Sequence, residues 1–226
     1  MNKLLQTFRI LHKAYGPQGW WPVTPEGENK PHYGVKITLQ RHRFEIAIGA
    51  ILTQNTAWTN AEKALIALHA KNVLTPEKIL KLQKEKLALL IRPAGYFNQK
   101  AERLMTLAEF FTTTDITQEE TTMLRTKLLA LQGVGPETAD SILLYAAEKP
   151  VFVIDAYTRR IFSRMGYLPE NGSYETWQNL FHSMLPKDTI LFKEYHALLV
   201  KHTKKACRKR PVCETCIFSD TCKKLV

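Results

Sequence analysis

The stretch from Leu131 to Arg160, LQGVGPETADSILLYAAEKPVFVIDAYTRR, constrains the fold of this chain more than any other part of it. A Gly-Val-Gly turn joins two segments whose apolar residues recur at helical spacing, and Pro136 follows at a position suited to the first turn of a helix. Two glycines permit unusual backbone conformations and let an anion approach main-chain N–H groups at a helix start. The turn therefore predicts either a plain helix–helix connection or a phosphate-binding turn.

The rest of the chain has a helical pattern nearly throughout. The segment 43–54 is apolar on most sides, which predicts a buried central helix. Residues 151–154 are apolar but have no evident partner strands, so we expect an extended buried connection and an all-α fold. The expected helices cover residues 3–14, 43–54, 59–70, 76–82, 84–91, 98–113, 118–131, 137–148, 156–165, 173–185 and 188–205.

Length and composition fit a globular protein. The 226 residues, 45% of them hydrophobic, can form one large or two small domains with a real core. No apolar run approaches the roughly 18 residues of a membrane span, and the first residues show no signal-peptide pattern. We expect a cytoplasmic monomer that is nucleoid-associated in a bacterium and has no membrane partner.

The charge is strongly positive and unevenly distributed. The formal net charge is +11, and residues 201–226 hold eight Lys or Arg against two acidic residues. Such a balance suits a polyanionic partner, although a solvated basic surface explains the charge equally well.

All four cysteines lie in this basic tail. The spacing C-x5-C-x2-C-x5-C places four thiols within a short loop, where they can surround one metal centre. Zinc and a [4Fe–4S] cluster both accept four thiolates, and the spacing alone leaves both possible. The residues are Cys207, Cys213, Cys216 and Cys222.

A lone acidic residue, Asp155, follows the Gly-Val-Gly turn by about twenty residues. It stands directly before the helix expected at 156–165, where aspartate is a common N-cap. A cap would also fix the position of the carboxylate, so a structural and a catalytic role are compatible.

The combination LQGVG-PETAD and VFVIDAYTRRIFSRMG resembles the helix–hairpin–helix DNA glycosylases of the endonuclease III superfamily, over residues 37–226. The resemblance implies a six-helix barrel over residues 37–149, with the helix–hairpin–helix at about 123–147. It implies a terminal helical domain formed by 1–36 and 150–226, with the active site in the cleft between the two domains. Asp155 takes the position of the family's catalytic aspartate, and Gly133, Val134 and Gly135 that of its DNA-binding hairpin.

The cysteine loop over residues 207–222 resembles the [4Fe–4S] loop of the same superfamily, which favours iron–sulfur over zinc. The first gap departs from the family pattern: the usual six residues are five here, and this affects the geometry at Cys207.

The residue before Thr138 carries a prediction about the reaction. Members of the family that also cleave the strand have a lysine there, whose amine attacks the sugar and forms a Schiff base. This chain has Glu137, and a carboxylate cannot form a Schiff base. We therefore expect a monofunctional glycosylase of base excision repair that leaves the abasic strand intact.

Three further segments resemble a subgroup of 3-methyladenine DNA glycosylases: residues 50–56 (AILTQNT), 91–101 (IRPAGYFNQKA) and 20–22 (WWP). The resemblance implies a base pocket formed by Trp20, Trp21, Pro22 and Trp58. Indole faces suit a cationic, electron-poor base such as 3-methyladenine. The alternative is that these tryptophans are core anchors.

The same resemblance implies a way to extrude the target base from double-stranded DNA. Gln54 would fill the vacated space, although it could instead cap its own helix. Tyr96 would wedge beside it from a loop tip. Lys100 and Arg92 would contact phosphates unless they are only solvated surface.

Two competing functions remain. A mismatch glycosylase acting on adenine or thymine is the first; adenine-specific relatives carry an extra acidic residue early in the chain, which Glu45 could supply. The second is a non-catalytic DNA-binding iron–sulfur protein.

Overall fold

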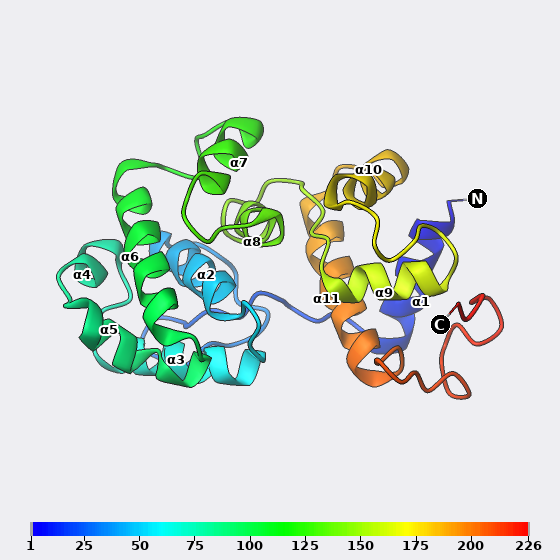
Figure 1. Cartoon of the computed structure of the whole chain (residues 1–226), viewed down its shortest axis with the longest axis horizontal. Helices are drawn as coiled ribbons and strands as arrows, with labels where there is room; N and C mark the ends of the chain where they lie inside the picture. Colours follow the sequence, from blue (N-terminus) through cyan, green and yellow to red (C-terminus); the bar gives the residue numbers. More distant parts are fainter. Residues whose placement is uncertain (1, 226) are drawn as a thin grey trace. The chain divides into compact units, whose positions relative to one another are not determined.

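The structure is a computed structural model that describes residues 2–225. Over this range the chain folds into eleven α-helices with two short helical turns, and the one pairing of extended backbone is an isolated bridge between Val23 and His32 (Figure 1). The expected all-α class is confirmed. The elements are α1 (Lys3–Tyr15), α2 (Gln40–Leu52), α3 (Trp58–Ala70), α4 (Pro76–Leu80), α5 (Lys84–Leu90), η1 (Arg92–Ala94), α6 (Phe97–Thr113), α7 (Thr121–Leu129), α8 (Pro136–Ser141), η2 (Ile142–Ala146), α9 (Ala156–Arg164), α10 (Tyr174–Met184) and α11 (Thr189–Lys205).

The chain divides into two compact units. We call Trp21–Lys149 the central unit; the terminal unit combines the chain up to Trp20 with the chain from Pro150 onward. The sequence placed residues 21–36 in the terminal domain, whereas their contacts lie in the central unit. Thr24 there donates its backbone N–H to the Glu45 carboxylate, and Val23 pairs with His32.

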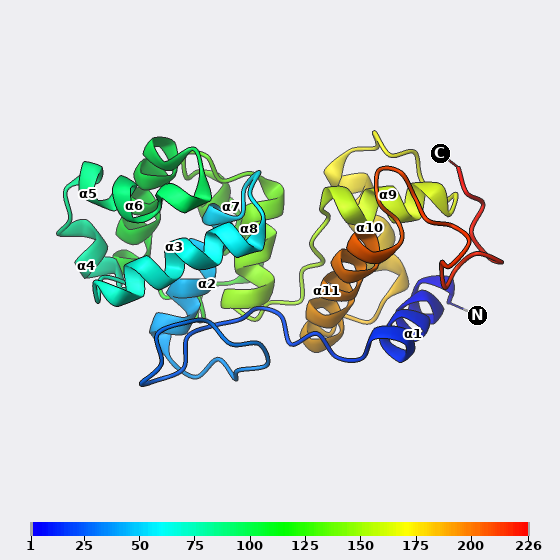
Figure 2. The same ribbon diagram turned by 90° about the horizontal axis from the view of Figure 1, so that it is seen from below.

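Helix α2 is the core of the central unit. Its residues from Phe44 to Leu52 are all buried, as expected from a segment that is apolar on most sides. Helices α3, α6 and α8 and the turn η2 contact it, as Figures 1 and 2 show. The chain that follows α2 therefore starts from a rigid base.

The helix–hairpin–helix differs in detail from the expectation. Helix α7 begins at Thr121 and not at residue 118, because the Glu120 carboxylate accepts the N–H groups of Thr122 and Met123 and so caps the helix there. The second helix begins one residue early, at Pro136, and its α-helical part ends at Ser141, where the π-helical turn η2 takes over.

The terminal unit packs α1 against α11, with α9 and α10 beside them (Figure 1). Aromatic side chains fill its core: Phe152 stacks on Phe181 with ring centroids 4.1 Å apart, and Tyr195 donates its hydroxyl to the Leu4 carbonyl. Residues 151–154 are extended and buried and pair with no strand, as expected.

Among the helices in residues 2–225, none combines the length and the apolar character that a membrane crossing requires.

Candidate active site and nucleic-acid interface

Asp155 caps helix α9 in the terminal unit. Its Oδ1 accepts the backbone N–H of Thr158 at 2.7 Å, which is the expected N-cap bond. Its Oδ2 lies 3.4 Å from Nε2 of His196 on α11. Both side chains are 10% exposed, so two elements hold the carboxylate in one orientation.

The surroundings of Asp155 favour its ionised form. Burial alone would raise the pKa of the carboxyl group, but the hydrogen bond and charge of His196, together with the Thr158 N–H, hold this pKa below its ordinary value. The carboxylate is thus available near neutral pH to face a developing positive charge. The sequence did not predict a contact between His196 and Asp155. A histidine forty residues away on an amphipathic helix carries no local signal for such a contact.

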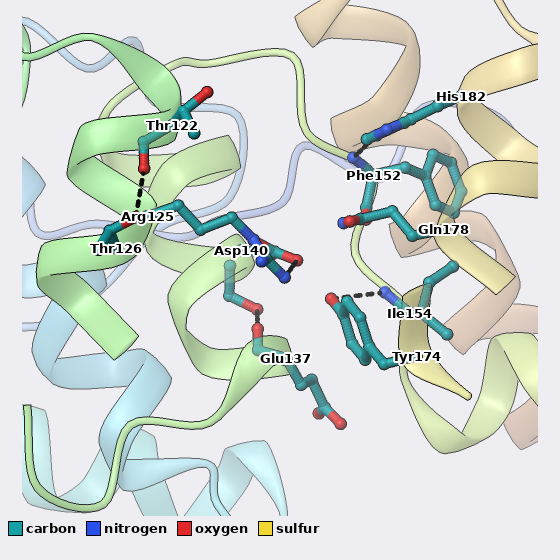
Figure 3. A network of polar contacts seen from close by, with 11 residues as sticks. Thr122, Arg125, Thr126, Glu137, Asp140, Phe152, Ile154, Tyr174, Gln178 and His182 are labelled. Atoms are coloured by element: carbon teal, nitrogen blue, oxygen red, sulfur yellow. Dashed lines mark hydrogen bonds and ion pairs between the residues drawn. The ribbon is translucent and has the colours of Figure 1, made fainter. Parts of the chain in front are cut away.

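Helix α10 holds the extended segment that leads to Asp155 (Figure 3). His182 accepts the N–H of Phe152 at 2.9 Å, and Gln178 donates to the carbonyl of Phe152 at 2.8 Å. Tyr174 accepts the N–H of Ile154 at 3.2 Å. These α10 side chains recur every four residues on one face, so the helix satisfies backbone groups that a neighbouring strand would otherwise satisfy.

The Gly-Val-Gly turn has the geometry of a tight hairpin. Gly133 has φ 79°, Val134 is buried and donates its N–H to the Leu131 carbonyl, and α8 starts at Pro136 with no side-chain cap. The first-turn N–H groups of α8 can therefore donate hydrogen bonds to an anion. Glu137 is exposed in that first turn.

An ion pair fastens the two helices of the hairpin to each other (Figure 3). The Arg125 guanidinium on α7 bonds to both carboxylate oxygens of Asp140, at 2.7 and 3.1 Å, and Asp140 is fully buried. The bidentate geometry fixes the crossing of the helices that present the turn. No local sequence pattern around Arg125 or Asp140 predicts this pair.

Gln54 also bonds to the hairpin. Its Nε2 donates to the Gly133 carbonyl and to Thr138 Oγ1, both at 3.0 Å, while its Oε1 accepts from Arg103 at 2.5 Å. Arg103 also lies against Gly133: a Cβ atom there would be 2.2 Å from the Arg103 Nε. Gln54 and Arg103 thus hold the hairpin against the rest of the central unit. No local sequence pattern indicates this role of Arg103.

The expected phosphate contact at Lys100 is wrong. The side chain is 1% exposed, and its ammonium donates to Leu52 O at 2.8 Å and to Thr56 Oγ1 and Ala94 O at 2.9 Å. Three internal acceptors take its three N–H bonds and leave none for DNA. Arg92, by contrast, is exposed.

Tyr96 lies at an exposed loop tip. The side chain is 67% exposed, and its backbone has φ 47°, directly after Gly95 with φ 67°. The left-handed pair reverses the chain before α6 and turns a large aromatic side chain outward. A wedge role stays a prediction that this geometry suits.

Of the expected base-pocket residues, the structure brings Trp21 and Trp58 together. Their rings meet at 90° with centroids 5.9 Å apart, and Trp21 also contacts Tyr145. Both tryptophans and Pro22 are buried in the central unit, while Trp20 is half-buried and belongs to the terminal unit. The pocket role of the four residues stays a prediction.

Glu45 is committed to a structural role. It is fully buried, and its carboxylate accepts the N–H of Thr24 at 3.0 and 3.1 Å and the Thr24 hydroxyl at 2.6 Å. Burial raises the pKa of this carboxyl group, and the hydrogen bonds of Thr24 oppose the rise. Glu45 therefore fastens the loop before α2.

The four cysteines line one cavity of the terminal unit, together with His202 and Phe218. All four are free thiols of intermediate burial, and burial raises the pKa of Cys207 and Cys216. Within residues 2–225, no three His, Cys, Asp or Glu side chains meet at a point that suits a single metal ion. Four sulfur donors around one cavity fit a group with four thiolate ligands. The residues are Cys207, Cys213, Cys216 and Cys222.

The sequence profile of the HhH-GPD superfamily, base excision DNA repair proteins, matches residues 48–187 and thus most of the chain. The chain belongs to this superfamily. The match includes the hairpin and Asp155. It confirms the expected kind of protein, a DNA repair glycosylase of the HhH-GPD family.

One relative of this HhH-GPD protein is similar over nearly its whole length. A protein of Methanocaldococcus jannaschii, provisionally named a DNA repair glycosylase, is 42% identical over 97% of this chain and 95% of its own. The solved structure of a non-covalent endonuclease III–DNA complex covers 98% of this chain and 94% of its own, with TM-score 0.78 and 19% identity. That likeness shows an endonuclease III-like fold.

Two solved glycosylases of stated substrate are also similar. The 3-methyladenine DNA glycosylase (MagIII) of H. pylori, bound to 1,N6-ethenoadenine, is 26% identical with TM-score 0.67 and covers 90% of this chain and 96% of its own. A thermostable thymine-DNA glycosylase is 27% identical with TM-score 0.67 and covers 82% of this chain and 86% of its own.

Proposed function

We propose that this protein is a monofunctional DNA glycosylase that removes alkylated purines such as 3-methyladenine from double-stranded DNA. The observation that carries the proposal is Asp155. It is a buried carboxylate held ionised by His196 and Thr158, at the position of the family's catalytic aspartate.

The chemistry assigned to Asp155 is electrostatic. The bond between C1′ and the base nitrogen breaks, and the bonding electron pair leaves with the base. The sugar is left as an oxocarbenium-like cation, which the carboxylate stabilises while it orients the attacking water. Water adds at C1′, and its proton passes to Asp155 and then to solvent. A base that is already cationic leaves as a neutral molecule, so no strong general acid is needed.

Glu137 supports hydrolysis without strand cleavage. It occupies the position where strand-cleaving relatives carry a lysine. A carboxylate has no amine nitrogen, so it cannot form a Schiff base at C1′. Water is then the only nucleophile, and the product is an intact abasic strand.

DNA binding is assigned to the central unit. The Gly133–Gly135 turn receives a backbone phosphate at the start of α8, a contact that positions the enzyme without reading sequence. Tyr96 wedges into the stack, and Gln54 fills the space beside it. The extruded base stacks against the tryptophans of the proposed pocket, and the similarity to the H. pylori 3-methyladenine glycosylase supports this substrate class.

The four cysteines are assigned to a [4Fe–4S] cluster, with zinc as the alternative. When bound, the cluster supplies a covalent anchor for the terminal loop. The basic residues Arg208, Lys209 and Arg210 belong to this loop, and Lys205 ends α11 just before it. Iron and acid-labile sulfide analysis of the purified protein tests the assignment: four of each per chain support it, and zinc without sulfide contradicts it.

Base release from methylated duplex DNA tests the main proposal. We expect free 3-methyladenine from the wild type, with strand breaks appearing only after alkali. Asp155→Asn should lower the rate by about a hundredfold or more while DNA binding persists, because asparagine keeps the helix cap but not the charge. Efficient cleavage without alkali contradicts the monofunctional assignment. Unchanged release by Asp155→Asn contradicts the catalytic one and favours a non-catalytic DNA-binding protein.

A thymine mismatch glycosylase is the second candidate, because a thymine-DNA glycosylase is as similar to this chain as the 3-methyladenine enzyme is. Release of thymine from a G·T duplex, measured beside release from methylated DNA, separates the two.

A further inference from the structure

Lys100 occupies a junction between two loops of the central unit. The Gln54 loop (residues 53–57) follows α2, and the Tyr96 loop (residues 91–96) precedes α6. The Lys100 ammonium bonds to Leu52 O and Thr56 Oγ1 on the side of the first loop, and to Ala94 O in the second. Thr56 Oγ1 also donates to Ala94 O at 2.5 Å, so the two loops meet at this ammonium.

A charged amine is well suited to this place. It supplies three donors to three acceptors, and Leu52 is the last residue of α2, where the helix dipole favours a cation. Burial and, second, the nearby Arg103 lower the pKa of Lys100 to about 8, so the group is charged at neutral pH. Without it, the Leu52 carbonyl oxygen would lose this partner, and the Ala94 carbonyl oxygen would keep only the Thr56 hydroxyl.

The two loops carry the side chains assigned to base extrusion, and each contains strained backbone. Asn55 has φ 52° and Tyr96 has φ 47°, both left-handed without being glycine. Such conformations cost about 1 kcal/mol or more each and persist only where the surroundings enforce them. The Lys100 ammonium bonds to Leu52 and Thr56, which stand on either side of Asn55 in the chain, and to Ala94, two residues before Tyr96.

We propose that Lys100 is a positioning residue for base extrusion: it ties the Gln54 loop to the Tyr96 loop so that the filling and wedging side chains act as one rigid element. This inference rests on the proposed function. Lys100 contacts neither DNA nor the reacting atoms. Its loss should impair extrusion of a paired base and leave both phosphate binding and the hydrolytic step nearly intact.

The test compares two duplexes that differ only in what faces the lesion. One carries an alkylated adenine opposite thymine, and the other carries it opposite an abasic-site analogue, where little pairing energy opposes extrusion. We expect Lys100→Met to lower single-turnover base release from the paired duplex by about tenfold or more. On the unpaired duplex the loss should stay within about threefold. Lys84→Met is the matched control, because it makes the same change at an exposed site bonded to Glu102.

An equal loss of release on both duplexes, or no loss on either, would overturn the proposal, since a merely destabilised fold does not distinguish them. If Lys100→Met fails to fold, as judged by helical circular dichroism, Thr56→Val decides. It removes the hydroxyl that accepts from the ammonium and donates to Ala94 O, and it keeps the ammonium. We expect Thr56→Val to cause the same selective loss of base release from the paired duplex, but a smaller one.

A second readout separates failure of this inference from failure of the proposed function. 2-Aminopurine placed beside a non-hydrolysable 3-deaza analogue of 3-methyladenine brightens when the neighbouring base leaves the stack. This signal requires no base release. We expect Lys100→Met to reduce it and Lys84→Met to preserve it. A wild type that extrudes the analogue but releases no alkylated base refutes the proposed reaction alone. An unchanged signal in Lys100→Met refutes the positioning role of Lys100 alone.

Discussion

The Oδ2 atom of Asp155 lies 3.4 Å from Nε2 of His196, and both side chains are almost fully buried. One residue caps α9, and the other belongs to α11, so the packing of two helices sets the environment of the carboxylate. Burial on its own would favour a neutral acid; the imidazole reverses this preference. The charge of Asp155 thus depends on the tertiary packing of α9 and α11.

Substitution of His196 should move the acid limb of the reaction upward in pH. Since His196 lowers the pKa of Asp155, its removal lets burial raise that pKa, and the active carboxylate is lost at a higher pH. His196→Leu should shift the limb furthest. His196→Gln should shift it less, because glutamine can still donate a hydrogen bond. Single-turnover base release against pH measures both.

The dependence of protein stability on pH should also report the pKa of Asp155. A carboxyl group whose pKa is lowered by folding stabilises the fold above its unfolded pKa, and this contribution is lost as pH falls through the lowered value. His196→Leu removes this contribution, and burial then raises the folded pKa of Asp155. The variant should therefore be less stable than the wild type at neutral pH, and the difference should shrink as pH falls and the carboxyl group takes up a proton. Identical acid limbs in all three proteins would contradict the role assigned to His196.

Gly133→Ala should destabilise the hairpin and weaken DNA binding. A Cβ at φ 79° is strained by about 1–2 kcal/mol, and it would meet the Arg103 side chain that bonds to Gln54. We expect a fall in melting temperature of about 3 °C or more. Gly135→Ala is the matched control for stability, because its φ is −91° and a Cβ there meets nothing within 4 Å. Equal melting temperatures in the two variants would contradict this account.

The sequence predicted the helices, the Gly-Val-Gly turn and Asp155 because each depends on local signals. Apolar periodicity, glycine pairs and an acid before a helix act over a few residues. The all-α class and the buried course of α2 followed from such patterns and are confirmed. The expected start of α7 at residue 118 is wrong because Glu120, an uncommon cap, begins the helix at Thr121.

The partners of these residues could not be predicted. His196, Arg103 and the hydrogen-bonding face of α10 act across gaps of tens of residues, and a single sequence does not record such pairings. Lys100 shows the limit most clearly. A lysine beside a loop suggests a surface cation, yet three backbone and hydroxyl oxygens from two loops make a buried site for it.

Glu45→Gln should leave base release nearly intact and lower stability. Both carboxylate oxygens accept bonds from Thr24, and an amide nitrogen in place of one of them would face an N–H donor. We expect a loss of about 1–3 kcal/mol in the free energy of unfolding, from denaturant titration. An adenine mismatch glycosylase that uses this acid would instead lose its activity at unchanged stability, so the variant also tests that alternative.

Lys100 should make the free energy of unfolding rise with pH above neutrality. Its pKa falls from the ordinary 10.5 to about 8 on folding, so between these values the unfolded chain binds more protons than the folded one. Stability contributed by this group must then increase as pH climbs from 8 towards 10, by no more than about 3 kcal/mol. Arg103 is the charged neighbour that faces it, and its charge is constant in this range. Denaturant unfolding of the wild type and of Lys100→Met at pH 7 and pH 10 isolates the effect, because cysteines and tyrosines titrate alike in both proteins. The difference between the two free energies should grow in favour of the wild type at the higher pH; a difference that stays constant or shrinks would show that the ammonium is not desolvated by folding.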